Sequence, residues 1–256
     1  GDSPIARSLI KAAELGKQVV ALIELTARFD EAVNVTWAKE LERAGVHVVY
    51  GVVGLKTHCK CVLVVRQEES GLRRYVHVGT GNYNSKTART YEDIGLFTCN
   101  ESIGDDVSHL FNSLTGFGRD HDYKRLIVAP RYLRNTMIEL IKKEITFGSE
   151  GHMVIKINGL ADAEMIELLY QASEAGVRID LIVRGVCCMR PSSDHEKNVR
   201  IRSVLGRYLE HSRMYHFAHG GRNNEPVYYI GSADLMPRNL DKRVEVLIPV
   251  EHPKHR

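Results

Sequence analysis

The sequence predicts an α/β protein built from two units of similar design, related by a pseudo-two-fold duplication. Three observations support this prediction: helical and strand patterns alternate along all 256 residues, the order of elements restarts near residue 120, and one His motif and one glycine loop occur twice at nearly the same spacing. Hydrophobic residues make up 43% of the chain, which is enough for a substantial core. We expect a first unit at residues 1–120 and a second unit at residues 121–256.

In the first unit, a helix begins at Pro4 with Asp2 or Ser3 as its cap and ends at Gly16. Each expected strand is a short apolar run bounded by polar residues or glycine, and each expected helix carries apolar residues three and four positions apart. The remaining elements expected are a strand at 19–25, a helix at 35–44, strands at 46–50, 54–65, 75–78 and 94–99, and a helix at 102–114.

The second unit repeats this alternation after a junction at residues 120–125. Pro130 opens a long helix, because proline suits the first turn, and Gly176 ends the next one. The elements expected are strands at 126–129, 153–157, 177–183, 211–217, 227–230 and 244–250, and helices at 130–147, 161–175 and 198–209, of which the last is unusually basic.

The strand at 54–65 carries a His and a Lys at its start. Side chains two positions apart on a strand share a face, so His58 and Lys60 point the same way and Cys59 and Cys61 the other. An imidazole and an ammonium could then converge on one phosphate-sized group. A single His-x-Lys is more often a structural histidine beside a solvated lysine, and only its repetition favours a functional interpretation.

The repetition is consistent in spacing. Residues 58–60 (His-Cys-Lys) match residues 211–213 (His-Ser-Arg), and the glycine loop 79–82 matches 231–234. The His precedes its loop by 21 residues in the first unit (79 − 58) and by 20 in the second (231 − 211). We therefore expect the two histidines to meet at the seam between the units.

A carboxylate also recurs in each unit. Asp93 and Glu245 each follow the first glycine of their loop by fourteen residues (93 − 79 and 245 − 231). A carboxylate that accepts a hydrogen bond from the distal ring nitrogen of a histidine fixes the orientation of the ring. We expect Asp93 and Glu245 to orient the two histidines in this way.

His-x-Lys followed by Gly-Thr-Gly-Asn, present twice, resembles the phospholipase D superfamily, in which two such motifs form one active site. The resemblance implies two phospholipase D-like α/β/α units. Neither unit carries the Asp that usually follows the Lys in that superfamily, and Val65 and its neighbours are apolar. This difference argues against an ordinary phospholipase or nuclease, although a phospholipase D-like phosphodiesterase remains the alternative function.

A more extensive resemblance is to the C-terminal catalytic region of bacterial polyphosphate kinase, of the type that forms a phosphohistidine. It covers nearly the whole chain and implies that amino-terminal domains and a C-terminal tail of that family lie outside this sequence. The matching stretches are residues 24–31, 54–60, 79–91, 183–188, 207–213 and 231–239.

The resemblance implies reversible transfer of the terminal phosphate of ATP to inorganic polyphosphate. It assigns the phosphohistidine to His58, and it assigns Tyr91, Arg184 and His211 to the nucleotide phosphates. A neutral imidazole is a usable nucleophile near pH 7, and a covalent intermediate divides the transfer into two steps. His211 is placed either to bind a nucleotide phosphate or to protonate a bridging oxygen.

Phosphoryl transfer requires positioning and charge compensation, which Lys60, Asn82 and Arg213 could supply by their places in the motifs. The resemblance assigns Arg28 to a Mg²⁺ site. A guanidinium has no lone pair to offer a metal, so we expect Arg28 to hold the phosphates that carry Mg²⁺.

Without the resemblance, several of these residues have simpler interpretations. Arg28 could form a surface ion pair, and Tyr91 could be a packed aromatic residue. Arg200, Arg202 and Arg207 are either a solvated helix face or the lining of a polyphosphate tunnel. The chain could also be a module that binds polyphosphate without turning it over.

Composition limits the partners and the location. The net charge of +3 is small, so affinity for polyanions must come from local clusters, and we expect no nucleic-acid partner. No apolar run reaches the length of a membrane span. Five cysteines without a C-x-x-C pair indicate reduced thiols in a cytoplasmic protein. The family resemblance implies a homo-oligomer.

Overall fold

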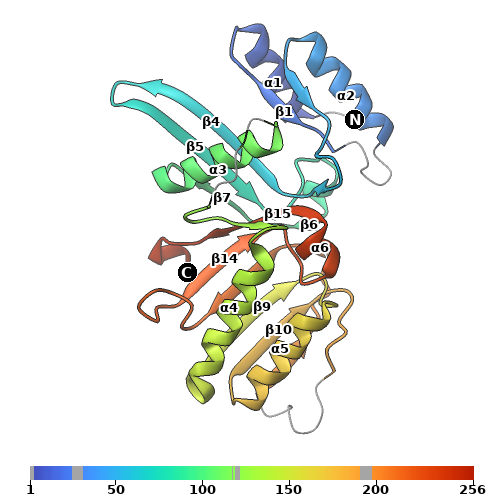
Figure 1. Ribbon diagram of the computed structural model, residues 1–256. Helices are drawn as coiled ribbons and strands as arrows, with labels where there is room; N and C mark the ends of the chain where they lie inside the picture. The colour runs from blue at the N-terminus through green and yellow to red at the C-terminus, as the bar shows by residue number, and fades with distance from the viewer. Residues whose placement is uncertain (1–2, 25–30, 117, 119–121, 191–197) are drawn as a thin grey trace.

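The computed structural model describes residues 3–24, 31–116, 118, 122–190 and 198–256. The first half of the chain lies above the second in Figure 1. The helices are α1 (Pro4–Glu14), α2 (Glu31–Arg43), α3 (Glu101–Leu114), α4 (Leu133–Thr146), α5 (Ala163–Glu174) and α6 (Pro237–Asp241). None of the helices in these ranges has the length and apolar character needed to cross a membrane.

The predicted strands occur in the predicted order with changed bounds. The strands are β1 (Val20–Leu22), β2 (His47–Val49), β3 (Lys56–Thr57), β4 (Lys60–Glu68), β5 (Gly71–Gly79), β6 (Tyr91–Glu92), β7 (Gly95–Thr98), β8 (Ile127–Ala129), β9 (His152–Ile157), β10 (Arg178–Val183), β11 (Val199–Arg202), β12 (Leu209–Glu210), β13 (Arg213–Phe217), β14 (Val227–Gly231) and β15 (Arg243–Pro249). Three of these strands, β6, β11 and β12, were not predicted. The predicted start of the first helix is confirmed, because the Ser3 hydroxyl accepts a hydrogen bond from the N–H of Ala6.

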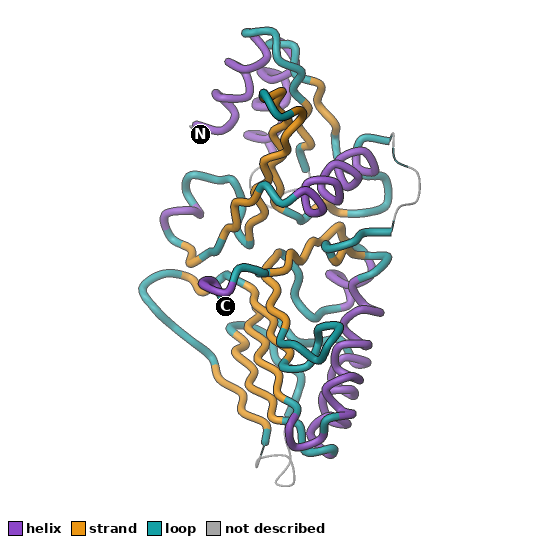
Figure 2. Tube along the Cα trace, turned by 90° about the vertical axis from the view of Figure 1, so that its left-hand side faces the viewer, coloured by secondary structure: helices purple, strands orange, loops and turns teal. Residues whose placement is uncertain are grey.

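An eight-stranded mixed sheet forms the centre of the second half. Its order is β11-β10-β9-β13-β14-β15-β3, and β8 also pairs with β15. Every second residue of β9 is buried, as expected for a strand with one covered face. Ile155 of β9 packs in one apolar core with Ile141 of α4 and Leu169 of α5. Figure 2 shows these helices along one side of the sheet.

The first half contains two smaller sheets in the part of the chain that the structure describes. β1 and β2 form a parallel pair, and β4, β5 and β7 form an antiparallel sheet. Val107 and Leu110 of α3 pack on Val76 and Val78 of β5. Helices pack on sheets in both halves, so the described chain is a mixed α/β structure.

The two halves exchange their His-bearing segments. β3 of the first half pairs in parallel with β15 of the second, where Thr57 lies opposite Val244. β12 of the second half pairs in parallel with β6 of the first, where Glu210 lies opposite Glu92. The short strand before each histidine is therefore paired with the other half's strand that contains Glu245, in the case of β15, or that directly precedes Asp93, in the case of β6.

The predicted strand at 54–65 is interrupted at His58. The backbone N–H groups of His58 and Cys59 both donate to the carbonyl of Val244, at 2.9 and 3.0 Å. Two residues that oppose one on the partner strand form a bulge, which changes the direction of the side chains. The strict alternation that the sequence predicts across residues 58–61 therefore does not hold.

The same irregularity occurs in the second half. The N–H groups of His211 and Ser212 both donate to the carbonyl of Glu92, at 3.1 and 2.9 Å. Each histidine thus lies at a bulge between a short parallel strand and a longer strand. The matching hydrogen bonds support the predicted duplication, which stays a prediction.

The predicted helix at 198–209 is wrong. Residues Val199 to Arg202 form β11, which pairs in parallel with β10 at the edge of the larger sheet. Val199 is buried and Ile201 half-buried, whereas Arg200 and Arg202 are exposed. This two-residue period is that of a strand, and it places the two arginines together on the exposed face.

Arg134 of α4 holds three segments of the second half together. Its guanidinium bonds both oxygens of Asp162, at 3.0 and 2.8 Å, and it also bonds Glu164 and Asp241. Asp162 is almost fully buried and caps α5 by accepting from the N–H of Met165.

We expect Arg134→Met to lower the free energy of unfolding by about 2–3 kcal/mol, because it leaves the buried Asp162 without its charge partner. Glu164 is 53% exposed, and Glu164→Gln should cost less than about 1 kcal/mol. Urea denaturation of both variants tests this prediction. Equal losses in the two variants would show that burial of Asp162 does not determine the effect.

Candidate active site

His58 lies beside β15 with its ring held by a buried carboxylate. Its Nδ1 is 2.8 Å from Oε2 of Glu245, which is fully buried. Glu245 also accepts hydrogen bonds from the Ser232 hydroxyl and from the amide of Asn239. An ionised carboxylate can only accept, so Nδ1 carries the proton and Nε2 keeps its lone pair.

The ring of His211, in the second half, is held in the same manner by a carboxylate of the first half. Its Nδ1 is 2.8 Å from Oδ1 of Asp93, which also accepts from the Thr80 hydroxyl at 2.6 Å. The expectation that Asp93 and Glu245 orient the histidines is therefore confirmed. The sequence left open which carboxylate serves which ring, and in both cases the carboxylate comes from the other half.

The hydroxyl beside each carboxylate completes the match between the halves. The Thr80 hydroxyl accepts from the N–H of Ile94 at 3.0 Å, and the Ser232 hydroxyl accepts from the N–H of Val246 at 3.2 Å. Each hydroxyl thus donates to the carboxylate and accepts from the backbone N–H of the residue that follows that Asp or Glu in the sequence. Sequence reasoning missed both hydroxyls, although their matching places after the loop glycine were a usable signal.

Two buried cations complete the cluster. Lys60 is 5% exposed, and its ammonium donates to the carbonyl of His58. Arg213 is 3% exposed and pairs with Asp234. Its Nη1 donates to the carbonyl of Thr80, at 3.3 Å, and thereby also connects the two halves.

The same two cations act on both imidazoles. Burial lowers the pKa of His58 below its usual 6.5, the hydrogen bond to Glu245 opposes this, and the charges of Lys60 and Arg213 lower it further. Burial likewise lowers the pKa of His211, with opposition from Asp93 and further lowering by Arg213 and Lys60. Both rings are therefore neutral near pH 7 and lie within electrostatic reach of one pair of cations.

Lys60 itself is perturbed by its surroundings. Burial lowers its pKa from the usual 10.5 to about 8, although the negative charge of Glu245 raises it. For Asp93, burial opposes ionisation, but hydrogen bonds from His211 and Thr80 outweigh it and lower the pKa. The cluster thus holds neutral imidazoles, an ionised carboxylate and a lysine that loses its charge near pH 8.

Tyr91 and Arg184 lie at the side of the cluster near His211. The rings of Tyr91 and His211 are 5.0 Å apart at their centroids. Nε of Arg184 donates to Oδ1 of Asn158 at 2.9 Å, and the amide of Asn158 donates to the carbonyl of His211 at 3.0 Å. Sequence analysis did not single out Asn158.

Two predicted site residues are not brought into the cluster by the contacts of the structure. Asn82 is exposed in the loop after β5, and hydrogen bonds within the described residues do not connect it to the histidines. Arg28 belongs to residues 25–30, outside the described residues. In the ranges that the structure covers, no group of three or more His, Cys, Asp or Glu side chains is arranged to hold a metal ion.

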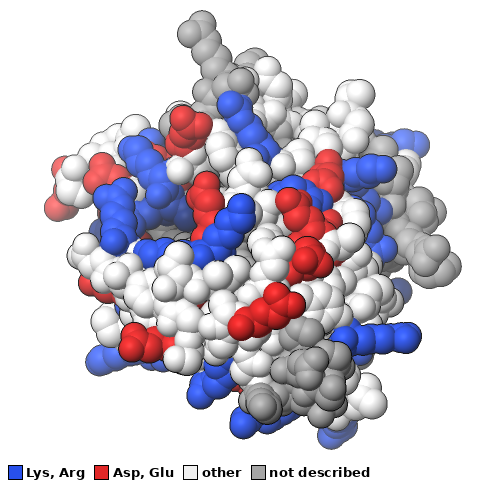
Figure 3. Space-filling view, turned by 60° about the horizontal axis from the view of Figure 1, so that its bottom comes forward, with Lys and Arg blue, Asp and Glu red and all other residues white. Residues whose placement is uncertain are grey.

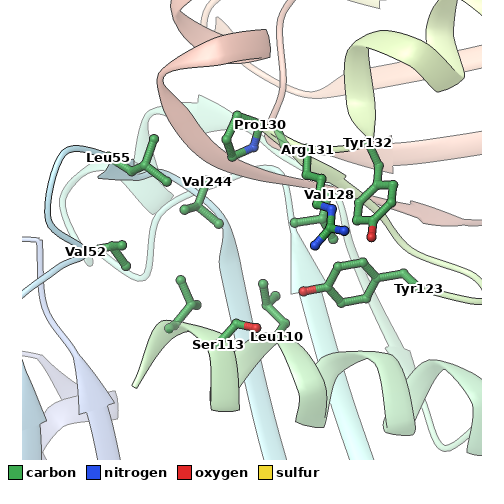
Figure 4. Close-up of a pocket in the computed structure, with 12 residues that line it drawn as sticks. Val52, Leu55, Leu110, Ser113, Tyr123, Val128, Pro130, Arg131, Tyr132 and Val244 are labelled. Atoms are coloured by element: carbon green, nitrogen blue, oxygen red, sulfur yellow. The ribbon is translucent and has the colours of Figure 1, made fainter. Parts of the chain in front are cut away.

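A separate cavity of about 190 Å³ lies between α3, the segment that enters β3, and the start of β15. Figure 4 shows its mainly apolar lining, which includes Leu55, Leu110 and Val244, with the Tyr123 hydroxyl directed toward Ser113. Neither histidine and neither buried cation lines it. Arg131 is the one charged side chain in its lining, so the cavity does not repeat the paired cations and histidines of the cluster.

Basic side chains are unevenly distributed on the molecular surface. On the face shown in Figure 3, several Lys and Arg side chains lie around a shallow hollow toward the left, with acidic side chains beside them, and further basic side chains lie at the right and along the bottom. With a net charge of only +3, such local gathering is the form of electrostatic attraction available to this chain.

Two family models match the chain. One is described as polyphosphate kinase C-terminal domain 1 and covers residues 1–120, and the other as polyphosphate kinase C-terminal domain 2 and covers residues 126–256. A polyphosphate kinase from Thermosynechococcus vestitus is 56% identical over 257 residues, and one from Mycobacterium avium is 56% identical over 258. Each match covers 99% of this chain but only 35% of the relative, so the chain spans about a third of their length.

The similarity to solved structures agrees with the family models. The crystal structure of a polyphosphate kinase from Porphyromonas gingivalis matches with a TM-score of 0.89 at 40% identity, over 100% of this chain and 39% of that one. A phosphatidylserine synthase from Haemophilus influenzae matches with a TM-score of 0.53 at 10% identity, over 98% of this chain and 81% of that one. The second similarity shows the fold alone. Together they confirm the predicted phospholipase D-like α/β fold.

Proposed function

Because the chain belongs to the polyphosphate kinase family, we propose that it forms the catalytic region for reversible transfer of the terminal phosphate of ATP to inorganic polyphosphate. One observation carries the proposal beyond family membership. His58 and His211 are each hydrogen-bonded through Nδ1 to a carboxylate. The charges of the same two buried cations, Lys60 and Arg213, lower the pKa of both rings. Such an arrangement suits one tetrahedral anion with a nucleophile on one side.

In the first step, Nε2 of His58 attacks the γ-phosphorus of ATP. A P–N bond forms, the bond from the γ-phosphorus to the bridging oxygen breaks, and ADP leaves with the electron pair. The Glu245 carboxylate stabilises the ring as it gains positive charge, because it accepts the Nδ1 proton in a hydrogen bond of 2.8 Å.

In the second step, a terminal phosphate oxygen of polyphosphate attacks the phosphohistidine. The P–N bond breaks, and Nε2 of His58 recovers its lone pair. Lys60 and Arg213 offset the negative charge of the transferred group, which is the main electrostatic requirement of phosphoryl transfer. Both are buried, so their charges act through little water.

We propose that His211 serves the nucleotide side of the same reaction. A bound phosphate adds negative charge, which favours the protonated ring, and Nε2–H can then donate to a phosphate oxygen. This donation either holds the oxygen or protonates it as the bridging bond breaks. Tyr91, which packs on His211, and Arg184, which is connected to it through Asn158, complete the proposed nucleotide side.

A metal ion enters the proposal only as the cation that accompanies the ATP phosphates, for which Mg²⁺ is the candidate. Among the described residues, no group of three or more His, Cys, Asp or Glu side chains is arranged to hold it. A homo-oligomer and a cytoplasmic location also stay predictions. The five free thiols support the location.

Incubation of the protein with γ-³²P-labelled ATP tests the proposed function. The expected result is an acid-labile, alkali-stable label on the protein that is lost on addition of ADP or polyphosphate. Absence of label in protein that still binds ATP would contradict the proposal. Release of an alcohol from a phosphodiester would favour the phospholipase D-like phosphodiesterase instead.

The pH dependence of kcat/KM for ATP should be bell-shaped. The rate should fall on the acid side as His58, whose pKa lies below 6.5, gains a proton, and on the alkaline side as Lys60, whose pKa is about 8, loses its charge. Lys60→Arg keeps the cation at all these pH values and should remove the alkaline decrease. An alkaline decrease that persists in Lys60→Arg would assign it to another group.

A further inference from the structure

Asn158, which takes no part in the proposed steps, connects the carboxyl end of β9 to three other segments of the second half. It follows β9 directly, at the carboxyl end where β9 and β10 run parallel. Its four polar groups each bond a different residue. The backbone N–H donates to Oδ1 of Asp234 at 2.7 Å, the backbone carbonyl accepts from Gly185 at 3.0 Å, the side-chain Oδ1 accepts from Nε of Arg184 at 2.9 Å, and Nδ2 donates to the carbonyl of His211 at 3.0 Å.

The chemistry of these partners selects an amide at this position. Nε of Arg184 is a donor and needs an oxygen, whereas the carbonyl of His211 is an acceptor and needs an N–H. An amide supplies one of each, whereas a carboxylate lacks the donor. The two contacts also fix the orientation of the amide without ambiguity.

The surroundings hold the two partners of Asn158 in place. A Cβ on Gly185 would lie 2.7 Å from the carbonyl oxygen of Asn158, so only glycine allows this close approach beside Arg184. Lys156, two residues earlier on β9, bonds the carbonyl and hydroxyl of Ser212, at 3.1 and 2.7 Å. The end of β9 therefore holds both Arg184 and the segment that carries His211.

We propose that Asn158 is a positioning residue that couples Arg184 to His211. The hydrogen bond to Nε sets the plane of the guanidinium and leaves its terminal nitrogens, which make no hydrogen bond within the described residues, as a fork for two phosphate oxygens. The bond to the His211 carbonyl keeps the imidazole at a fixed distance from that fork. This inference rests on the proposed function, because it takes the phosphates of ATP to be the ligand of both residues.

The structure provides a matched control for loss of a structural amide. Asn198 is also half-buried, and it directly precedes β11, at the amino ends of the parallel strands β10 and β11 of the same sheet. Its side chain bonds the carbonyls of Ser173 and Val177, at 2.8 and 2.9 Å, and the Ser173 hydroxyl, at 3.0 Å. Removing either amide breaks comparable contacts, but only Asn158 contacts the proposed site.

In the intact protein, Asn158→Ala should raise the KM for ATP about 10- to 100-fold, because a small displacement of the phosphate-binding groups has effects of this size. Asn198→Ala should lower the melting temperature by a similar amount and leave this KM within about twofold of that of the unaltered protein. An unchanged KM in Asn158→Ala, or equal increases in both variants, would overturn the inference.

A double-mutant cycle with Arg184→Ala tests whether Asn158 acts through Arg184. If it does, Asn158→Ala should change the KM for ATP by less than about threefold when Arg184 is already absent. Fully additive effects would overturn the coupling. Asn158→Asp provides a second variant in case Asn158→Ala does not fold, and its negative charge beside Arg184 should raise the KM as well. A KM unchanged in Asn158→Asp would count against the inference.

Labelling of the unaltered protein by γ-³²P-labelled ATP separates this inference from the proposed function. No label in the unaltered protein would contradict the proposed function, and with it the identity of the ligand assigned here. Label in the unaltered protein, together with a KM that does not respond to changes at Asn158, would contradict the positioning role alone.

Discussion

His58→Ala should abolish the acid-labile label from γ-³²P-labelled ATP and reduce polyphosphate synthesis by about 10⁴-fold or more. Removal of a covalent nucleophile has effects of this size, because the remaining groups cannot form the intermediate. The substitution removes only a ring that is 20% exposed at the end of a short strand, so the fold should persist. If the label is retained in this variant, the phosphohistidine is a residue other than His58.

His211→Ala is the matched variant, since His211 occupies the equivalent position and is held by an equivalent carboxylate. We expect it to retain the label but to form it about 10²- to 10³-fold more slowly, the usual contribution of a residue that binds or protonates a leaving group. If the label is lost in His211→Ala and retained in His58→Ala, then His211 is the nucleophile and His58 serves the nucleotide.

Glu245→Gln should slow labelling of the protein by about 10²- to 10⁴-fold with little change in ATP binding. The carboxylate accepts hydrogen bonds from His58, Ser232 and Asn239, whereas an amide offers one oxygen and one donor. The amide N–H can donate to Nδ1 and thereby stabilise the tautomer of His58 that carries its proton on Nε2. In this tautomer Nε2 has no lone pair with which to attack phosphorus. Single-turnover labelling measures this rate directly.

The pH profile provides an independent signature for Glu245. Its hydrogen bond and its charge raise the pKa of His58, so their removal should move the acid side of the profile to lower pH while the maximum rate falls. Asp93→Asn is the control at the equivalent position, and it should slow labelling only about 10-fold if His58, and not His211, carries the phosphoryl group as proposed. Equal losses in the two variants would argue against separate roles for the histidines.

The repeated spacing predicted the residues at the centre of the candidate site, but not all of the residues around them. Two His motifs, each about twenty residues before a glycine loop, identified His58, Lys60, His211 and Arg213, and a fixed offset identified the two carboxylates. The crossing between halves could not be predicted. Spacing along the chain is the same whether a carboxylate serves its own histidine or the other one, and only the pairing of β3 with β15 and of β12 with β6 decides it.

Local signals failed where they were short. The alternation of Val199 with Arg200 extends over only four residues, too few to distinguish a strand from the helix predicted at 198–209. Asn158 is followed by Gly159, and an Asn-Gly pair is typical of a turn. Its four hydrogen bonds depend on Asp234, on the Arg184–Gly185 segment and on His211, which only the folded chain brings together. The bulges at the histidines likewise depend on carbonyls far away in the sequence.

The exchange of segments between the halves limits how this protein can be divided or recombined. A chimaera that takes residues 1–120 from one relative and the rest from another must keep both contacts between His58 and Glu245 and between His211 and Asp93, since neither portion contains a complete pair. Two separately produced portions would each lack a proton acceptor for their own imidazole. Phosphorylation would then report their reassembly, as complementation assays with split enzymes do.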